Sequence, residues 1–218
     1  MSATAYTQMQ KAYYESEIDP NTDVVGSFDW HENFPYETLL LHEDGDIRKP
    51  IFPSLSGLRA LDFACGPGRM VARMSKLFAA VGGVDISNRL VNVARQRCPS
   101  SNFWVASGAD LGDAPLKSYD FIYRTIAIQH IAVHDIRERI FYAMKDRLRS
   151  GGKVTLQMAY STIYPFRRTT RNYEFGPMRV EFLKKEAKHA EWNENKLDAT
   201  VTNGYCDVAI TQKDLPVI

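Results

Sequence analysis

Several features that mark other protein classes are scarce in this sequence. Its 218 residues include three cysteines, Cys65, Cys98 and Cys206, and no two of them are spaced like zinc ligands or a redox pair. The polar N-terminus lacks the apolar core of a signal peptide, and no run approaches the roughly 18 apolar residues of a membrane span. We therefore expect a cytoplasmic protein with reduced thiols, no membrane association and no metal site.

An excess of charge of one sign is also missing. The 27 basic and 26 acidic side chains leave a formal net charge of +1, which does not favour nucleic acid as a partner. Apolar residues make up 44% of the chain, as in ordinary soluble domains. A chain of this length can bury a core without disulfides or metals, so we expect one globular domain.

Strand-like and helix-like segments alternate from residue 58 onward. Short apolar runs predict strands at 59–64, 82–86, 103–106, 120–123 and 153–158. Helical spacing and cap residues predict helices at 7–17, 35–42, 70–80, 90–97 and 137–149, the last ended by Gly151-Gly152. This alternation indicates βαβ units in a parallel sheet, hence a doubly wound α/β fold with helices on both faces.

The turn after the first predicted strand contains two glycines, Gly66 and Gly68. Glycines let the backbone approach a ligand closely, and the helix that follows offers unpaired N–H groups. Asp85 ends the second predicted strand, where a carboxylate can accept both hydroxyls of a ribose; alternatively, Asp85 caps the next helix. The order of strand, loop, helix, strand and acid predicts a nucleotide-type cofactor site.

Two enzyme classes share this arrangement, nicotinamide or flavin oxidoreductases and methyltransferases. The dinucleotide fingerprint requires a third small residue where this chain has Val71. Asp62 also places a carboxylate inside the apolar strand, where it needs a partner and would repel a phosphate. Both features favour a methyltransferase.

Five segments resemble, in order, the motifs of class I S-adenosylmethionine-dependent methyltransferases; they are 61–69, 84–87, 108–111, 118–131 and 148–156. Ser150 stands where that family usually has proline. The resemblance implies S-adenosyl-L-methionine as cofactor and a Rossmann-like, seven-stranded sheet in the order 3-2-1-4-5-7-6. It also implies cofactor contacts at Asp62, Ala64, Cys65, Gly66, Gly68, Asp85, Ile86, Asp110 and Leu111, with Asp110 meeting the adenine amino group.

Methyl transfer needs alignment of the reacting atoms and, for hydroxyl acceptors, a general base. His130, just past the fourth strand, is the first candidate base, since its ordinary pKa suits proton transfer near neutrality. The alternative is a structural histidine, and His134 is the second candidate. Arg124 is expected to face the methionine carboxylate or an acidic acceptor, unless it is solvated. The small size of Cys65 explains its place in the loop better than nucleophilic catalysis does.

The absence of two sequence motifs narrows the possible classes of methyl acceptor. The chain has neither an Asp/Asn-Pro-Pro-Tyr/Phe segment nor a Pro-Cys dipeptide, which argues against nucleic-acid amino and cytosine C5 methylation. A small-molecule or saccharide acceptor remains, modified on oxygen or nitrogen. Aromatic and arginine side chains between residues 160 and 175 suit an acidic, sugar-like or phosphorylated acceptor. A catalytically silent cofactor-binding subunit is the alternative from another functional class, and a nicotinamide oxidoreductase is the third.

Three parts of the single domain follow. Residues 1–57 are expected to form a lid and substrate segment, with Tyr13, Tyr14, Trp30 and Phe34 facing the site. Residues 58–158 form the cofactor-binding core, and residues 159–218 the substrate-side insert and C-terminal elements.

The C-terminal part raises a question about the last strands. Residues 180–192 have helical spacing, and 197–202 and 205–211 read as a hairpin around Asn203-Gly204. We nevertheless expect that the chain lacks its terminal strands. The prediction is a five- or six-stranded core that forms a homodimer through its open edge or covers that edge with residues 160–218.

Overall fold

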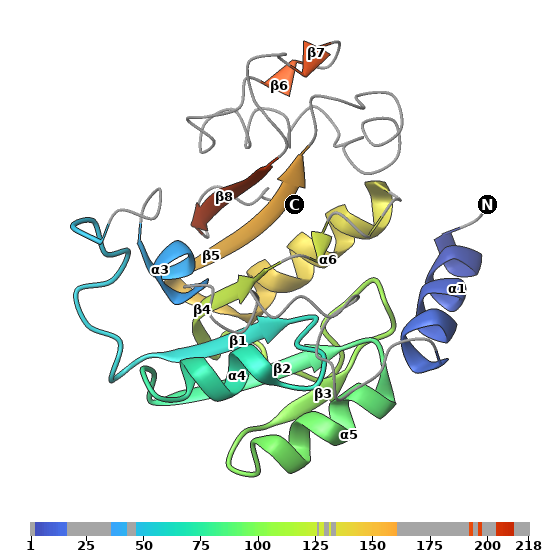
Figure 1. The fold of residues 1–218 in the computed structure, drawn as a ribbon, viewed down its shortest axis with the longest axis horizontal. Helices are drawn as coiled ribbons and strands as arrows, with labels where there is room; N and C mark the ends of the chain where they lie inside the picture. Colours follow the sequence, from blue (N-terminus) through green and yellow to red (C-terminus); the bar gives the residue numbers. More distant parts are fainter. Residues whose placement is uncertain are drawn as a thin grey trace.

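A parallel sheet organises the protein, as the sequence predicted. The computed structural model describes residues 3–16, 36–42, 47–125, 127–128, 131, 134–160, 192–193, 196–197 and 204–211. Within them, six strands lie side by side in the order β3-β2-β1-β4-β5-β8 (Figure 1). Their bounds are β1 Arg59–Phe63, β2 Ala80–Asp85, β3 Phe103–Val105, β4 Tyr119–Arg124, β5 Leu148–Tyr160 and β8 Gly204–Thr211. Strands β1 to β5 pair in parallel with one another, and β8 is antiparallel to β5.

Helices cover both faces of this sheet. One apolar cluster includes side chains of α3 (Tyr36–Leu41), α4 (Arg69–Met74) and α5 (Asn88–Arg97). The other includes those of α6 (His134–Arg147) and Tyr6 of α1 (Ala3–Ser16). Because a parallel sheet has two buried faces, its strands are apolar on both sides. The doubly wound α/β prediction is thus confirmed. Among the described residues, no helix has the length and hydropathy needed to cross a bilayer.

The helix predicted at 70–80 is shorter in the structure. α4 ends at Met74, and the hydroxyl of Ser75 donates a hydrogen bond to the carbonyl of Val71. The N–H of Ala79 then donates to Leu58 O over 3.0 Å, and Ala80 pairs with Arg59 to begin β2. The predicted helix was too long because Phe78 continues the apolar spacing of α4 in the sequence. In the structure Phe78 packs in the core from the turn that follows the helix.

The junction of α6 and β5 also differs from expectation. The helix ends at Arg147, and β5 begins at once and includes Gly151-Gly152. Gly151 has φ +77°, a conformation that glycine adopts without strain. The pairing with β4 shifts register between Tyr119 and Phe121, so the glycine pair accommodates an irregular strand and not a helix end.

The edge of β5 is covered by β8, in the position of strand seven in the order that the resemblance implied. Eight residue pairs join the two strands, from Lys153–Thr211 to Tyr160–Gly204. Among the described residues the sheet has six strands, and residues 204–211 cover the edge of β5, as predicted. The expectation that the chain lacks its terminal strands is wrong for strand seven, which β8 forms, while a homodimer stays a prediction. Residues 198–203 of the predicted hairpin lie outside the described residues. Leu197 pairs instead with Trp192, through the short strands β6 (Trp192–Asn193) and β7 (Lys196–Leu197), which replaces the helical end expected at residue 192.

Candidate cofactor site

The candidate site lies where β1, β2 and β4 reach their carboxyl ends, which parallel pairing brings to one edge of the sheet. Asp62 of β1 is paired in register with Gly83 of β2 and Tyr123 of β4. Asp85 and Arg124 are the last residues of their strands. The structure therefore gathers three of the predicted site residues, Asp62, Asp85 and Arg124, from separate parts of the chain.

The glycine loop has a left-handed backbone at three positions, with φ +57° at Ala64, +54° at Gly66 and +84° at Gly68. A Cβ on Gly68 would lie 3.0 Å from that of Ala94 on α5, so glycine also allows the loop to approach that helix. A Cβ on Gly66 would meet nothing within 4 Å. The loop is thus closely packed on the α5 side and open at Gly66, as a backbone cradle for a ligand requires.

Asp85 fixes the loop to the end of β2. Its Oδ2 accepts the backbone N–H of Gly66 over 2.8 Å, and its Oδ1 accepts that of Ser87 over 2.9 Å. Burial raises the pKa of Asp85, and these two hydrogen bonds counteract the rise. The alternative role as helix cap is not what the structure shows, because the Ser87 hydroxyl accepts the N–H of Leu90 and is the N-cap of α5. Each Asp85 oxygen keeps a lone pair for another donor.

Asp62 is fully buried, and neither of its oxygens accepts a hydrogen bond from the described residues. Its nearest ion pair is with Arg124, with Nη1 at 3.8 Å from Oδ1. Burial raises the pKa of Asp62 to about 7, although Arg124 and Arg69 lower it. A buried carboxylate without donors costs free energy, and this position marks where a cationic or N–H group of a ligand would bind.

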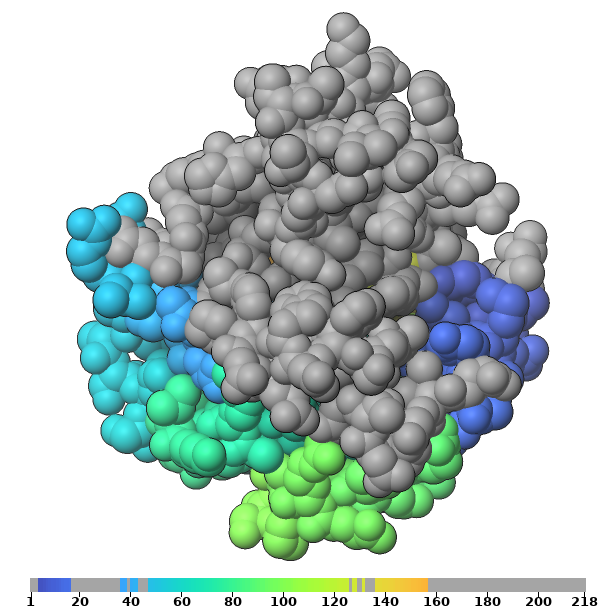
Figure 2. Space-filling model, in the orientation of Figure 1, coloured from blue at the N-terminus to red at the C-terminus, as the bar shows by residue number. Residues whose placement is uncertain are grey.

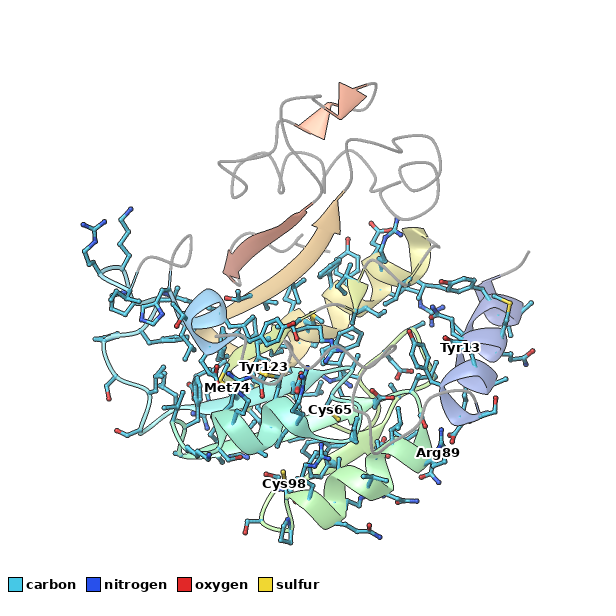
Figure 3. The ribbon with its side chains drawn as sticks, viewed as in Figure 1. Tyr13, Cys65, Met74, Arg89, Cys98 and Tyr123 are labelled. Carbon is cyan, nitrogen blue, oxygen red and sulfur yellow. The ribbon has the colours of Figure 1, made fainter. Side chains whose placement is uncertain are left out.

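Cys65 is buried and packs beneath the loop, between β1 and β2. A Cβ on Gly83 would lie 2.7 Å from Cys65 Sγ, so the small residues match each other. Burial, with Asp85 and Asp62 nearby, raises the pKa of the thiol well above its ordinary value. A protonated, buried thiol is a poor nucleophile, and Figure 3 labels Cys65 beside the end of α4.

The loop after β3 holds the last predicted contacts. Asp110 accepts the backbone N–H groups of Ser107 and Gly112, over 3.0 and 2.9 Å. Partial burial raises the pKa of Asp110, but the hydrogen bonds from Ser107 and Gly112 outweigh it and hold the pKa below its ordinary value. Leu111 is fully buried in the core, and Ile86 is half-buried beside Gly108. Side-chain contact with a cofactor is open to Asp110 and Ile86, whereas Leu111 offers its backbone.

The N-terminal helix α1 adds a wall that only part of the sequence analysis anticipated. The pKa of Tyr14 is raised to about 12 by burial, with the charge of Arg124 lowering it and that of Asp85 raising it. Tyr13 is 44% exposed, and its ring meets that of Tyr14 edge-on with the centroids 5.3 Å apart; that it faces the site stays a prediction. Trp30 and Phe34 lie outside the described residues.

The catalytic candidates are less fully described. His130 and the aromatic and arginine side chains between 161 and 175 lie outside the described residues. His134 begins α6, and only its backbone is described. Arg124, 19% exposed at its side chain, is directed to Asp62; it is not the solvated arginine of the alternative interpretation.

The residues present fit the cofactor that the resemblance implies. S-adenosylmethionine carries an α-ammonium group and a ribose. The site offers the Asp62 carboxylate, which accepts no hydrogen bond from the described residues, and the carboxylate oxygens of Asp85. The open face of Gly66 lies between them in the chain, and its N–H orients Asp85. Two features were not predicted from the sequence: the charge of Arg69 near Asp62 and the contact of Glu15 with α5.

Comparison with known proteins agrees with this geometry. Residues 60–152 match the model of a family described as a methyltransferase domain. The chain is 30% identical over 122 residues to trans-aconitate 2-methyltransferase of Paracidovorax citrulli, covering 55% of this chain and 45% of that protein. It is 27% identical over 151 residues to the ubiquinone biosynthesis O-methyltransferase of Xanthomonas euvesicatoria, covering 66% and 61%.

The chain spans about half the length of the first curated relatives it matches. Among solved structures, phosphoethanolamine N-methyltransferase 1 of Haemonchus contortus, in complex with phosphoethanolamine and S-adenosylhomocysteine, superposes with a TM-score of 0.60 at 15% identity. The match covers 85% of this chain and 41% of that one. At this identity the likeness concerns the fold.

Proposed function

Because the chain belongs to the class I S-adenosylmethionine-dependent methyltransferases, we propose that it transfers a methyl group to a small-molecule or saccharide acceptor, on oxygen or nitrogen. The observation that carries the proposal is Asp62, a fully buried carboxylate with no hydrogen-bond donor among the described residues, beside an open glycine loop. An α-ammonium group is the donor that this carboxylate lacks.

Each site residue then has a task. When bound, the cofactor supplies a methyl group on a good leaving group, so the hard chemistry is its own. Asp62 binds the α-ammonium group, Asp85 accepts the ribose hydroxyls and holds the Gly66 loop, and Asp110 with Ile86 borders the adenine. Tyr14 covers the site from α1 and excludes water. Rate enhancement comes mainly from holding the reacting atoms in line.

The acceptor is the less defined part of the proposal. The names of the curated relatives refer to trans-aconitate and to ubiquinone biosynthesis, which supports a small-molecule acceptor here. Arg124 supports an acidic one, because its guanidinium lies at the carboxyl end of β4 and its Nε donates to no described residue. His130 stays the proposed base for a hydroxyl acceptor, and residues 1–57 the proposed lid.

Binding and turnover test the proposal separately. Isothermal titration with S-adenosylhomocysteine should give saturable binding, and a thermal-shift panel should show stabilisation by this compound and none by NAD or NADP. Transfer of labelled methyl from S-adenosylmethionine to a panel of carboxylic acids, phenols and amino sugars then identifies the acceptor. Binding of NAD(P) alone would contradict the proposal. Cofactor binding without turnover on any acceptor would indicate the silent subunit instead.

A further inference from the structure

The connection between α1 and the cofactor site runs through one side chain, Glu15. Its Oε1 accepts the backbone N–H of Asn88 over 2.6 Å, and its Oε2 accepts that of Arg89 over 3.2 Å. These are the first two residues of α5, and the Ser87 hydroxyl accepts the N–H of the third, Leu90. Glu15 and Ser87 together therefore satisfy the N–H groups that a helix start leaves unpaired.

Other contacts also hold α1 against α5 and the neighbouring loop after β3. Arg89 donates from Nη2 to the carbonyl of Tyr14 over 3.5 Å, and Figure 3 shows Arg89 at the end of α5 that faces α1. Tyr6 is buried in the core, and the position of a Cβ on Gly108 lies 3.1 Å from Thr7. In the space-filling view the blue atoms of α1 adjoin the green atoms of this region (Figure 2).

The contact of Glu15 with α5 lies close in the chain to two residues of the candidate site. Asn88 follows Asp85 by three residues, through the turn in which Ser87 also donates to Asp85. Tyr14, the neighbour of Glu15, contacts the same helix start through its carbonyl, which accepts from Arg89, and the charges of Asp85 and Arg124 act on the pKa of its hydroxyl. A carboxylate that holds the start of α5 thus holds Tyr14 beside this helix and steadies the turn that follows Asp85.

We propose that Glu15 is a positioning residue for the cofactor: by accepting the first two N–H groups of α5, it fixes α1 across the turn after Asp85 and presents Tyr14 to the bound cofactor. This inference rests on the proposed function, because it assigns a role in binding the same cofactor. Glu15 contacts the protein and not the reacting atoms, so it acts through Tyr14 and Asp85.

Glu15 accepts from the backbone N–H of Asn88, and a proline substitution can remove this N–H. Proline is favoured at the first position of a helix, which Asn88 occupies. Ser87 before it has φ −91° and ψ 116°, an extended conformation that a following proline tolerates. Asn88→Pro therefore deletes the N–H that donates to Glu15 Oε1 while it leaves α5 able to form.

A double-mutant cycle on the full chain tests the inference, with S-adenosylhomocysteine as the probe. Glu15→Ala is expected to raise the dissociation constant about tenfold, as loss of a helix cap does, and Glu15→Gln less. Asn88→Pro should weaken binding in the same way, and the double variant should be no weaker than Glu15→Ala alone. Gln8→Ala, on the exposed side of α1, is the control and should bind like the wild type.

Readouts beyond affinity distinguish positioning from a general loss of stability. Hydrogen exchange at 25 °C should quicken within α1 of Glu15→Ala but not within β1 or β4, and the loss of turnover should lie more in KM for the cofactor than in kcat. If Glu15→Ala and Glu15→Gln both bind the probe like the wild type, or if the effects in the cycle are fully additive, this inference is overturned and the proposed function is not. A wild-type chain that does not bind the probe would overturn the proposed function with it.

Discussion

Gly66 and Asp85 are joined by a hydrogen bond of 2.8 Å, from the backbone N–H of the glycine to Oδ2 of the acid. Gly66 belongs to the turn after β1, and Asp85 is the last residue of β2. The acid that the family resemblance assigns to the ribose therefore also shapes the loop beside it. A substitution at Asp85 acts on the cofactor directly and through that loop.

Replacement of Asp85 should weaken cofactor binding strongly. Asp85→Ala leaves the N–H groups of Gly66 and Ser87 without their acceptor and removes the ribose contact, so we expect a loss of roughly 1–3 kcal/mol in S-adenosylhomocysteine affinity. Asp85→Asn keeps one acceptor oxygen and should lose less. Titration calorimetry measures both, with the exposed Asp113→Asn as a control that should not change. An Asp85→Ala variant that binds like the wild type would rule out this site.

Asp62 should make stability depend on pH in an unusual direction. Its pKa in the folded protein is about 7, raised by burial, whereas an exposed aspartate titrates near 4. The folded state therefore binds the proton more tightly, and stability falls as pH rises from about 4 to about 7, by up to about 1.4 kcal/mol per pH unit. Urea unfolding of wild type and Asp62→Asn should show this difference. Parallel pH profiles for the two proteins would contradict it.

The same carboxyl predicts how cofactor affinity varies with pH. Below pH 7 the free protein holds Asp62 protonated, and binding an α-ammonium group favours the ionised form, so binding releases a proton. The association constant for S-adenosylhomocysteine should rise about tenfold per pH unit up to about 7 and then level off. Calorimetry between pH 5.5 and 8.5 measures it. Asp62→Asn should bind weakly with a flatter profile, and a flat wild-type profile would be incompatible with this role.

Two glycine substitutions should differ sharply in stability. Gly68→Ala places a Cβ at φ +84° and 3.0 Å from the Cβ of Ala94. We expect it to lower the free energy of unfolding by about 1–2 kcal/mol from the backbone conformation alone. Gly57→Ala meets nothing within 4 Å and is the matched control. Chemical denaturation should leave the midpoint of Gly57→Ala close to that of the wild type; equal midpoints for both variants would contradict the strain.

The core of the fold could be predicted because its signals are local. Apolar runs, the glycine turn and Ser87 before a helical pattern each depend on a few adjacent residues, and all lie where expected. The predicted bounds of helices and strands were wrong where tertiary packing, and not the spacing of apolar residues, decided the local structure. Phe78 continued a helical pattern from a turn, and the glycines of β5 fit a register shift that no neighbouring residue reveals.

The walls of the site were harder to predict for the same reason. Glu15 caps a helix that begins 73 residues later in the chain. Tyr13 and Tyr14 are equivalent by sequence, although Tyr13 is exposed and Tyr14 is half-buried. Only the placement of α1 separates them. That Asp62 accepts no hydrogen bond from the described residues is likewise a property of the assembled strands.

The pairing of β5 with β8 has a consequence for synthesis. β8 comes from residues 204–211, far along the chain from Tyr160 at the end of β5. During translation, at about 5–20 residues per second, the nascent chain can complete its first five strands several seconds before the sixth leaves the ribosome. For that interval β5 is an open edge of the kind that pairs with other chains, and chaperones that shield strand edges would act on this protein at that stage.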